Sequence, residues 1–415
     1  PSPGDMAVIA FGFWLAAFLF ARVPLAALEW LSGVDFQPYG CINALALAAA
    51  LLAGCRHTAR GLSCWRRPGV LPVIVAFGLF WLLYLLRLGI DQWWLDLPLV
   101  RSAPRLVREW AASTLVPALL LPWLLPKRFG VRLFDWVAAL GNLAIGFGLV
   151  VYRFWPYKDA WAGQRFGFAD LNPIPAGHSA ASLLLIGASL LLLEPGRWQQ
   201  RSTRLWHLNA LLALAIGLAG VFASSTRSAL VALLPLLLVL LLQTIQRLRL
   251  QQVLLALPLV ALVAAITLRF SQLGQRLLQS GHEASSTERL TIAAEGLRLF
   301  WQNPLLGSGF RGHLLLSELP TTRHHWYPHN LPVEALMLGG LSLAIPFGLF
   351  LWCCAKTALG ELIHPTPRLG FALLWLQGLV FSLFSGHLGS VPLFWVGGLM
   401  LVFSVDAVGD APHRG

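Results

Sequence analysis

Three groups of polar residues stand at the ends of long apolar runs, and each contains a side chain suited to binding an anion or moving a proton. The first is Ser224–Ser228, which places Arg227 among small hydroxyl residues where two apolar runs meet. An ionisable residue at the edge of an apolar span is costly and by default indicates a functional site. The alternative is an arginine at a helix end whose head group reaches into water.

The second group is a loop rich in glycine and proline. It runs through Gln164–Phe168 and Asn172–His178, directly before another apolar run. This density of glycine and proline indicates an ordered, non-helical loop. Such backbone is tolerated near a membrane only against protein or a wet cavity. Arg165 would then face an anion in a cavity, unless it is a solvated loop arginine.

The third group is the segment His324–Asn330, which contains three histidines. Histidines this close raise the question of a metal site, but the nearest carboxylates are Glu318 and Glu334, and there is no HExxH pattern. We therefore expect no metal and no other cofactor. His329 adjoins the next apolar run and is favoured as a proton acceptor, because imidazole titrates near neutral pH. The alternative is a histidine at a helix start that backbone groups satisfy.

The composition shows what kind of structure must position these groups. Hydrophobic residues make up 57% of the chain and charged residues only 12%, with a mean hydropathy of +0.70. These values exclude an ordinary soluble protein and indicate a chain that crosses a membrane several times. The cations behind the net charge of +12 stand between apolar runs, so we do not expect nucleic acid as a partner.

The sequence predicts an all-α polytopic membrane protein with about 12 transmembrane helices of roughly 17–25 residues each. Backbone inside a bilayer must satisfy its own hydrogen bonds, and the alternating pattern of a membrane barrel is missing, so the spans are expected to be helices. The expected spans are 6–28, 41–55, 69–90, 111–125, 133–154, 178–194, 205–222, 228–243, 251–268, 332–354, 369–386 and 390–408.

Short loops rich in arginine and lysine set the expected orientation, because such loops favour the cytoplasmic side. Residues 1–268 then hold the first nine spans. Residues 269–331 form a large periplasmic loop between the ninth and tenth spans, and 332–415 hold the last three spans and a short cytoplasmic tail. The cytoplasmic loops are expected at 56–67, 127–132, 197–204 and 247–249.

Two segments outside the spans have recognisable character. Residues 91–110 mix tryptophans with arginines, which predicts a segment that lies in the membrane interface against lipid headgroups. In the long loop, apolar residues recur at helical spacing from Arg289 to Trp301, after the hydroxyl residues 285–287. We expect this loop to be structured, with a helix that ends before Asn303.

The order of these motifs resembles the O-antigen ligase and polymerase superfamily. The resemblance rests on the long outward loop, on the arginine in Ser224–Ser228, and on His329-Asn330 followed by Glu334 and the glycine-rich residues 338–341. Within the superfamily the chain most resembles the O-antigen ligases. The specific part of the resemblance covers about 165–178, 224–230 and 288–341.

The resemblance implies a GT-C-like glycosyltransferase in the bacterial inner (cytoplasmic) membrane, with its active site facing the periplasm. Such an enzyme transfers O-antigen glycan from undecaprenyl diphosphate to a sugar hydroxyl of the lipid A-core acceptor. His329 would be the catalytic base, and arginines would contact the diphosphate. The implied diphosphate contacts are Arg227, Arg289 and Arg165, and the supporting residues are Asn330, Glu334, Glu288 and His325.

The chemistry of the reaction fits these residue types. Glycosyl transfer from a diphosphate must stabilise growing negative charge on the departing group, and preorganised arginines can do so without a metal. One base suffices for a direct displacement that inverts the anomeric centre. A retaining reaction would need a protein nucleophile, and no convincing carboxylate stands on this face.

Two alternatives remain from the sequence. An O-antigen polymerase or a protein O-oligosaccharyltransferase of the same superfamily would share most of the pattern and differ in its acceptor. A flippase or transporter of lipid-linked glycan would also suit a bundle with cationic cavities. Against a transporter, matching halves with paired broken helices are not evident, and transport does not require so large an outward loop.

We predict that 269–331 lies outside the cytoplasmic membrane and folds over the membrane domain. Single cysteines placed in this segment of a cysteine-free variant should react with a membrane-impermeant thiol reagent in intact spheroplasts. Reaction only after the membrane is broken would reverse the topology.

Overall fold

The computed structural model describes residues 3–34, 69–126, 129–155, 165–168, 171–193, 203–233, 235–236, 239, 284–320 and 326–404. The predicted spans 41–55 and 251–268, most of 228–243 and the candidate residue His325 lie outside the described residues. Within them the regular structure is helical, as predicted. The elements are α1 (Pro3–Phe20), α2 (Arg22–Ser32), α5 (Leu71–Gly89), η1 (Ile90–Trp94), α6 (Ala103–Trp110), η2 (Ala111–Leu115), α7 (Val116–Leu124), α8 (Arg132–Phe154), α9 (Pro173–Leu193), α10 (Arg204–Ser224), α11 (Arg227–Val231), α15 (Ala284–Gln302), α16 (Arg311–Ser317), α17 (Leu331–Ile363), α18 (Leu369–Phe384) and α19 (Pro392–Phe403).

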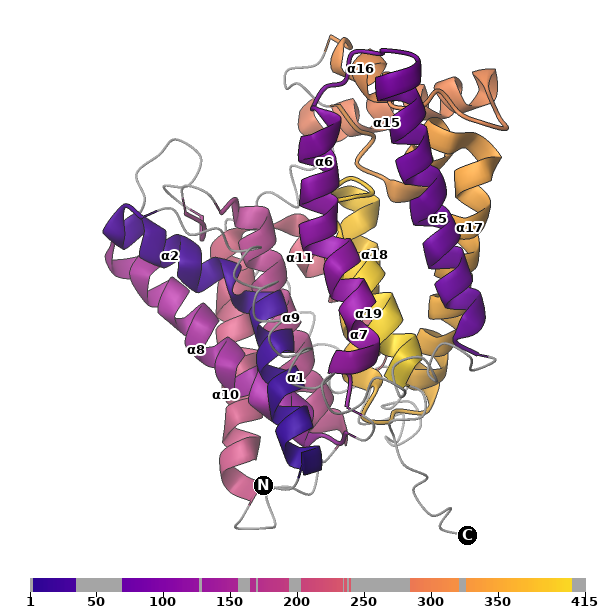
Figure 1. Cartoon of the computed structure of the whole chain (residues 1–415). Helices are drawn as coiled ribbons and strands as arrows, with labels where there is room; N and C mark the ends of the chain where they lie inside the picture. Colours follow the sequence, from indigo (N-terminus) through magenta and orange to yellow (C-terminus); the bar gives the residue numbers. More distant parts are fainter. Residues whose placement is uncertain are drawn as a thin grey trace, which may run out of the picture.

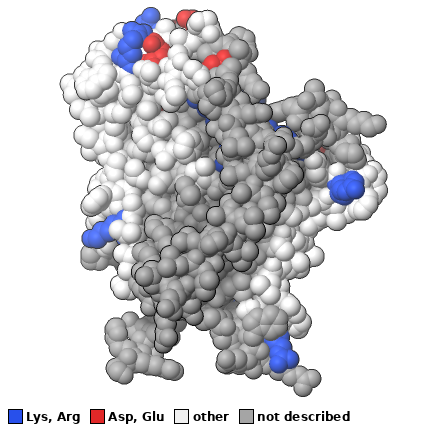
Figure 2. Space-filling model, turned by 180° about the vertical axis from the view of Figure 1, so that it is seen from behind, with Lys and Arg blue, Asp and Glu red and all other residues white. Residues whose placement is uncertain are grey.

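The chain is an all-α polytopic membrane protein. Five described helices are long and apolar enough to cross a bilayer, and the pair α1 and α2, bent by 61°, makes up to six. The expected spans 369–386 and 390–408 correspond to the shorter apolar helices α18 and α19. Figure 2 shows charged side chains of both signs together at the upper end of one face, above a described surface that is largely uncharged.

The helices form two groups that meet where α9 contacts α18. In Figure 1, α1, α2, α8, α9 and α10 stand on one side and α5, α6, α7, α17, α18 and α19 on the other, with α15 and α16 across the upper end. Glycines bring α9 and α10 close together. A Cβ on Gly217 would lie 2.6 Å from the Leu184 nitrogen, and one on Gly187 would lie 2.8 Å from the Ala210 oxygen. Small residues allow such backbone approach between membrane helices.

Aromatic side chains fill the interior of the second group. The Phe80 and Trp395 ring centroids are 4.6 Å apart, which joins α5 to α19, and Phe350 lies 5.0 Å from the same tryptophan. Trp110, at the end of α6, is 1% exposed and packs 4.8 Å from the Tyr84 ring. We predicted that 91–110 lies against lipid headgroups. This is wrong for Trp110, because its ring packs against the rings of the core. Trp93 and Trp94 are 71% and 84% exposed.

The segment 303–309 is inserted beside a break in α17. Gly340 has φ 58° and ψ −146°, so the helical hydrogen bonds cannot continue through it. Instead, the backbone nitrogens of Ser308 and Gly309 donate to the Met337 and Leu338 oxygens at 2.7 and 3.0 Å. In return, the nitrogens of residues 341 and 342 donate to the oxygens of residues 304 and 305 at 2.8 and 3.2 Å. This exchange satisfies the backbone groups that the break exposes.

Beyond the predicted end at residue 354, α17 continues to Ile363. The predicted helix of the long loop corresponds to α15, which ends at Gln302, before Asn303 as expected. It begins at Ala284, so the hydroxyl residues 285–287 lie within its first turns rather than ahead of it.

We predict that Gly340→Ala destabilises the fold, because a Cβ there would lie 2.4 Å from the Pro304 oxygen and the residue has a positive φ. The strained backbone alone costs about 1–3 kcal/mol. Thermal unfolding in detergent should show a clear drop in melting temperature. Gly348→Ala in the same helix is the matched control, because its Cβ would meet no atom within 4 Å. Equal melting temperatures for the two variants would contradict the role assigned to the break.

Candidate functional site

Loops from distant parts of the chain gather at one end of the bundle, the upper end in Figure 1. We call it the loop end and define it by residues 90–102, 165–168, 171–173, 224–228, 303–310, 326–330 and 385–391. Three contacts hold it together. The Arg165 Nε donates to the Ser224 oxygen at 2.9 Å, the Arg87 Nη1 to the Leu306 oxygen at 3.2 Å, and the backbone nitrogen of residue 388 to Glu334 at 2.8 Å. Of the predicted site residues, Arg165, Arg227, His329 and Asn330 lie in these segments, and Glu334 contacts one of them.

Arg165 and Arg227 belong to one loop cluster beside α9, α10 and α11. The Arg165 Nη2 also donates to the Thr226 Oγ1 at 3.3 Å, and the Thr226 hydroxyl in turn donates to the Pro173 oxygen at 3.1 Å. Ser225 has φ 49°, which turns the chain sharply between α10 and α11. Arg227 is therefore the first residue of a new helix, carried on a turn that Arg165 braces.

Buried polar contacts join this cluster to α18. The His178 Nε2 lies 3.0 Å from the Ser228 Oγ, and the His178 ring packs 4.5 Å from the Phe381 ring. The Gln377 side chain donates to the His178 oxygen at 2.6 Å and accepts from Ser182 at 2.8 Å. Buried polar groups need such partners. The position of the Ser224–Ser228 turn is thus fixed against the upper half of α18.

Arg289 lies on the other side of the same helix end. Its Nη1 donates to the Phe384 oxygen at 2.8 Å, at the last residue of α18. The carboxyl end of a helix carries partial negative charge, so a cation is favourable there. This contact fixes α15 over the end of α18 and places the Arg289 guanidinium at the loop end. Glu288, the neighbouring residue on α15, is half-buried.

His329 is held in an unusual backbone conformation. Its φ is 55°, in the left-handed region, and its side chain is 8% exposed. Its ring centroid lies 4.2 Å from that of Tyr327. Asn330 then caps α17, because its side chain accepts from the Val333 nitrogen at 3.2 Å. Non-glycine residues in this region are strained and concentrate at functional sites, so the conformation supports a role for His329 beyond helix capping.

Glu334 holds three segments together from a fully buried position. Its side chain is 0% exposed, and one carboxylate oxygen lies 3.0 Å from the His313 Nε2. The other oxygen accepts from the Leu388 nitrogen at 2.8 Å. The carboxylate therefore links α17, α16 and the 385–391 loop. Glu334 thus holds His313 and the 385–391 loop in fixed positions beside the start of α17.

Two further side chains complete the surroundings of His329. Burial, and secondarily Glu334, raise the pKa of Tyr327 to about 12, while Arg289 and Arg101 lower it. Burial lowers the pKa of His387 well below its usual value, with help from His313, Arg101 and His329. The Tyr327 and His387 ring centroids lie 5.5 Å apart. Both groups are neutral at pH 7, and the charge of Arg101 lowers the pKa of each.

The predicted site residues thus form two clusters on either side of the carboxyl end of α18. One contains Arg165 and Arg227, and the other contains Arg289, His329 and the groups around Glu334. Sequence reasoning did not single out His313 or His387. His387 could have been found by its position beside an apolar run, which it follows in Ser385-Gly386-His387. His329 was selected for a similar position, before an apolar run.

The described residues include no group of three or more His, Cys, Asp and Glu side chains that could hold a metal ion. The histidines of the second cluster are surrounded mainly by aromatic rings. Trp326 packs 5.0 Å from His313 and 4.8 Å from His387, measured between ring centroids. Residues 324 and 325 lie outside the described part of the chain, so the clustering of all three predicted histidines is not described.

We predict that Glu334→Ala destabilises the protein more than Glu334→Gln. Alanine leaves the buried His313 ring and the Leu388 nitrogen without this partner, at about 1–3 kcal/mol for each unsatisfied group. Glutamine can still accept from the Leu388 nitrogen and approach His313. Thermal unfolding measures the difference. Glu318→Ala, at an exposed position after α16, is the control and should unfold like the wild type. Similar melting temperatures for Glu334→Ala and Glu318→Ala would contradict this role.

Comparison with known proteins found one family model that matches part of the chain. A search of curated proteins found no match to the chain. The family model described as O-Antigen ligase matches residues 212–353. The matched range contains Arg227, Arg289, His329, Asn330 and Glu334, whereas Arg165 and His387 lie outside it. The match, with the helical membrane fold that carries it, supports membership of this chain in the O-antigen ligase superfamily.

Proposed function

We propose that the protein is an O-antigen ligase of the bacterial inner membrane. It transfers glycan from an undecaprenyl diphosphate-linked donor to a sugar hydroxyl of lipid A-core at the periplasmic face. The reaction inverts the anomeric centre and needs no metal. The observation that carries the proposal is the position of His329, buried and held at positive φ in the cluster that contains Arg289, at one end of an apolar bundle.

The arginines supply the charge that a diphosphate leaving group needs. Arg227 begins α11 on a turn braced by Arg165, and Arg289 is held against the Phe384 oxygen. Guanidinium groups fixed before the reaction stabilise developing negative charge without reorganisation. Their forked donors match the oxygens of phosphate. A donor lying across the end of α18 would contact both clusters.

His329 supplies the base. A sugar hydroxyl is a weak nucleophile, and an imidazole within hydrogen-bond reach can take its proton as it attacks. Tyr327 packs against the ring, and the capped start of α17 fixes the backbone on the other side. Attack from the face opposite the diphosphate explains inversion with a single base.

The expected orientation rests on short basic loops and not on a count of cations, because the loop end also carries arginines such as Arg101, Arg165 and Arg227. Arg132 begins α8, Arg204 begins α10 and Arg368 precedes α18, all at the end of the bundle away from the loop end. Arginines at short loops favour the cytoplasmic side. The loop end, with His329, would then face the periplasm, where the acceptor is exposed.

Reconstitution of the purified protein tests the function directly. With lipid-linked O-antigen and rough lipopolysaccharide, a ligase produces lipopolysaccharide of increased size. Growth of the lipid-linked glycan itself would identify a polymerase, and transfer to a protein hydroxyl would identify a protein oligosaccharyltransferase. Movement of the donor between leaflets without any transfer would identify a flippase and overturn the proposal.

We predict that Arg227→Lys and Arg289→Lys both lower turnover, because a lysine cannot replace a forked pair of donors. The loss of a charge-assisted contact corresponds to about 1.5–3 kcal/mol. The rate of product formation and the melting temperature should be measured together. Arg298→Lys is the control, because Arg298 lies on α15 and pairs with Glu295 at the surface. Wild-type turnover in both test variants would show that forked contacts are not used.

We predict that His329→Asn lowers turnover by roughly 10²–10⁴ while donor affinity is kept, because only the base is lost. Asparagine is chosen because it tolerates positive φ, so the backbone conformation is preserved. His364→Asn, at the exposed far end of α17, is the control. Normal product formation would make His329 a structural residue. Loss of donor binding would instead assign it to the diphosphate site.

A further inference from the structure

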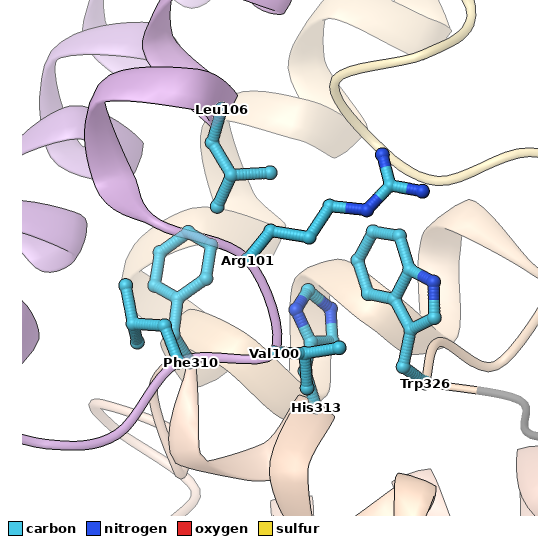
Figure 3. A pocket seen from close by; sticks show the side chains of 7 residues that line it. Val100, Arg101, Leu106, Phe310, His313 and Trp326 are labelled. Carbon is cyan, nitrogen blue, oxygen red and sulfur yellow. The ribbon is translucent and has the colours of Figure 1, made fainter.

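The side chains around Arg101 at the loop end pack closely together. In Figure 3 the Arg101 side chain lies above the His313 ring, with its guanidinium toward Trp326. The space left among these side chains is about 10 Å³, which is room for about one water molecule. A larger partner of the loop end would therefore meet its outer surface, and an apolar part of that surface lies on α15.

An apolar stripe runs along the outer face of α15, the helix that crosses the upper end of the bundle in Figure 1. We call it the outer stripe and define it by the exposed residues Leu290, Ala294, Leu297 and Trp301. Leu290 and Trp301 are 73% and 74% exposed. At about 100° of rotation per residue, the four side chains fall within about 60° of the helix circumference. Ile292 and Leu299, on the opposite face, are buried, so the outer stripe points away from the protein.

The helix is polar along one side of the outer stripe. Thr287, Thr291 and Arg298 are exposed along that side, and the Arg298 Nε donates to the Glu295 carboxylate at 2.8 Å. A helix with an apolar face and a charged or polar side is favourable in the plane of a membrane surface. Its apolar side chains then reach the acyl boundary, while its polar side chains stay among headgroups and water.

The face of α5 that meets lipid ends at the loop end. Exposed apolar side chains recur on it every three or four residues, through Leu82, Leu86 and Ile90 to Trp93. Because α5 with η1 is long and apolar enough to cross a bilayer, this face is expected to contact lipid. Trp93 and Trp94 end it, and tryptophan is typical of the boundary between acyl chains and headgroups. The upper end of α5 therefore marks the membrane boundary.

The 303–309 segment joins this boundary to α15, which it directly follows in the chain. The Leu306 oxygen accepts from the Arg87 Nη1 of α5 at 3.2 Å, and the Leu305 oxygen accepts from the Ser342 nitrogen of α17 at 3.2 Å. The side chains of Leu305 and Leu306 are both exposed. Apolar surface thus continues from the ends of the lipid-facing helices through these two leucines to the outer stripe.

The length of α17 places α15 at the depth of the headgroups. From the break at Gly340 to Ile363 the helix is about 33 Å long, which matches a hydrocarbon core of about 30 Å. A Cβ on Gly296 of α15 would lie 2.9 Å from the Val333 side chain and 3.7 Å from that of Met337. These residues stand one to two turns before the break, or roughly 5–11 Å above it. The headgroup layers, which add roughly 10–15 Å to the core in total, begin at this depth.

We propose that α15 lies in the membrane interface, with its outer stripe inserted among the lipids of the leaflet at the loop end. The partner is the lipid surface itself, near the boundary between headgroups and acyl chains. This contact does not depend on the proposed function, but it has a consequence for it. Because α15 carries Arg289, its immersion would hold that guanidinium at the depth of lipid phosphates, where the diphosphate of a lipid-linked donor lies.

Fluorescence quenching tests the depth of the helix. The full-length, cysteine-free protein with Leu290→Cys or Leu297→Cys is labelled with a fluorophore and reconstituted in nanodiscs. The quenchers are lipids with a nitroxide near the headgroup or near the acyl-chain end, and iodide in the water. Both labels should lose more fluorescence to the shallow nitroxide than to the deep one, and should be protected from iodide.

Two exposed positions calibrate the measurement. Trp352→Cys, about 18 Å below Gly340 on an exposed face of α17, should be quenched most by the deep nitroxide. Glu318→Cys, after α16, should be quenched by iodide alone. Outer-stripe labels that behave like the Glu318→Cys label would place α15 in water and overturn the proposal. Protection from all three quenchers would show that protein, such as a second copy of the chain, covers the stripe, and would overturn it as well.

A double variant tests whether the outer stripe holds the helix in the lipid. Leu290→Gln with Leu297→Gln leaves the buried face of α15 unchanged, so the melting temperature in detergent should stay near that of the wild type. A label on Ala294→Cys should then lose its quenching by the shallow nitroxide and become accessible to iodide. Thr287→Gln with Thr291→Gln, on the polar side, is the matched control and should change neither. Equal quenching of the Ala294→Cys label in the two double variants would contradict the proposal.

Discussion

The geometry of the loop end depends on the exchange of backbone hydrogen bonds between α17 and the segment 303–309. A helix that breaks inside an apolar bundle exposes peptide groups that lipid cannot satisfy. The chain meets this constraint with another piece of its own backbone, inserted where Gly340 interrupts the helix. The insertion carries the start of α16 with it and so positions His313. The first turns of α17, with Glu334, become a short rigid unit separate from the long membrane helix below the break.

Buried carboxylates then connect this unit to the rest of the bundle. Asp91 is 0% exposed, pairs with Arg87 at 3.0 Å, and accepts from the Phe310 nitrogen at 2.6 Å. Glu334 makes the corresponding link to the 385–391 loop. Removing a partner from such a group leaves charge or polarity buried and is costly. Two buried acids therefore fix the backbone of the 303–310 and 385–391 segments at the loop end.

Much of the membrane fold follows from the sequence because long apolar runs have few alternatives in a bilayer. Residues 69–90, 133–154 and 205–222 correspond closely to α5 with η1, α8 and α10. The helix of the long loop was equally readable from its apolar spacing. Arg165, Arg227, Arg289 and His329 were recognisable as a class, since ionisable residues beside apolar runs are rare. Their division into two clusters depends on the packing of α18, which no local pattern encodes.

The contacts that complete the site have no sequence signature. Asp91 and Phe310 are separated by 219 positions, and their bond uses a backbone nitrogen whose residue type carries no information. No motif of the sequence singles out His313, and its contact with Glu334 arises only from the folded chain. Trp110 shows the converse error, because tryptophan in a basic segment is typical of a membrane interface and here the ring faces the core. Local composition indicates whether a segment favours the membrane interface, whereas tertiary packing decides which of its side chains are buried in the protein.

The two π-helical turns, η1 and η2, bracket the segment that supplies Arg101. Such turns are rare and hold one residue more than an α-helical turn, often at functional positions. Since one residue corresponds to about 100° of helix rotation, deletion of a residue within η2, which joins α6 to α7, can restore regular helix while reorienting α6 relative to α7. A single-residue deletion at η2 would therefore turn the arginines of α6, Arg105 and Arg108, to another side of the bundle without removing a helix.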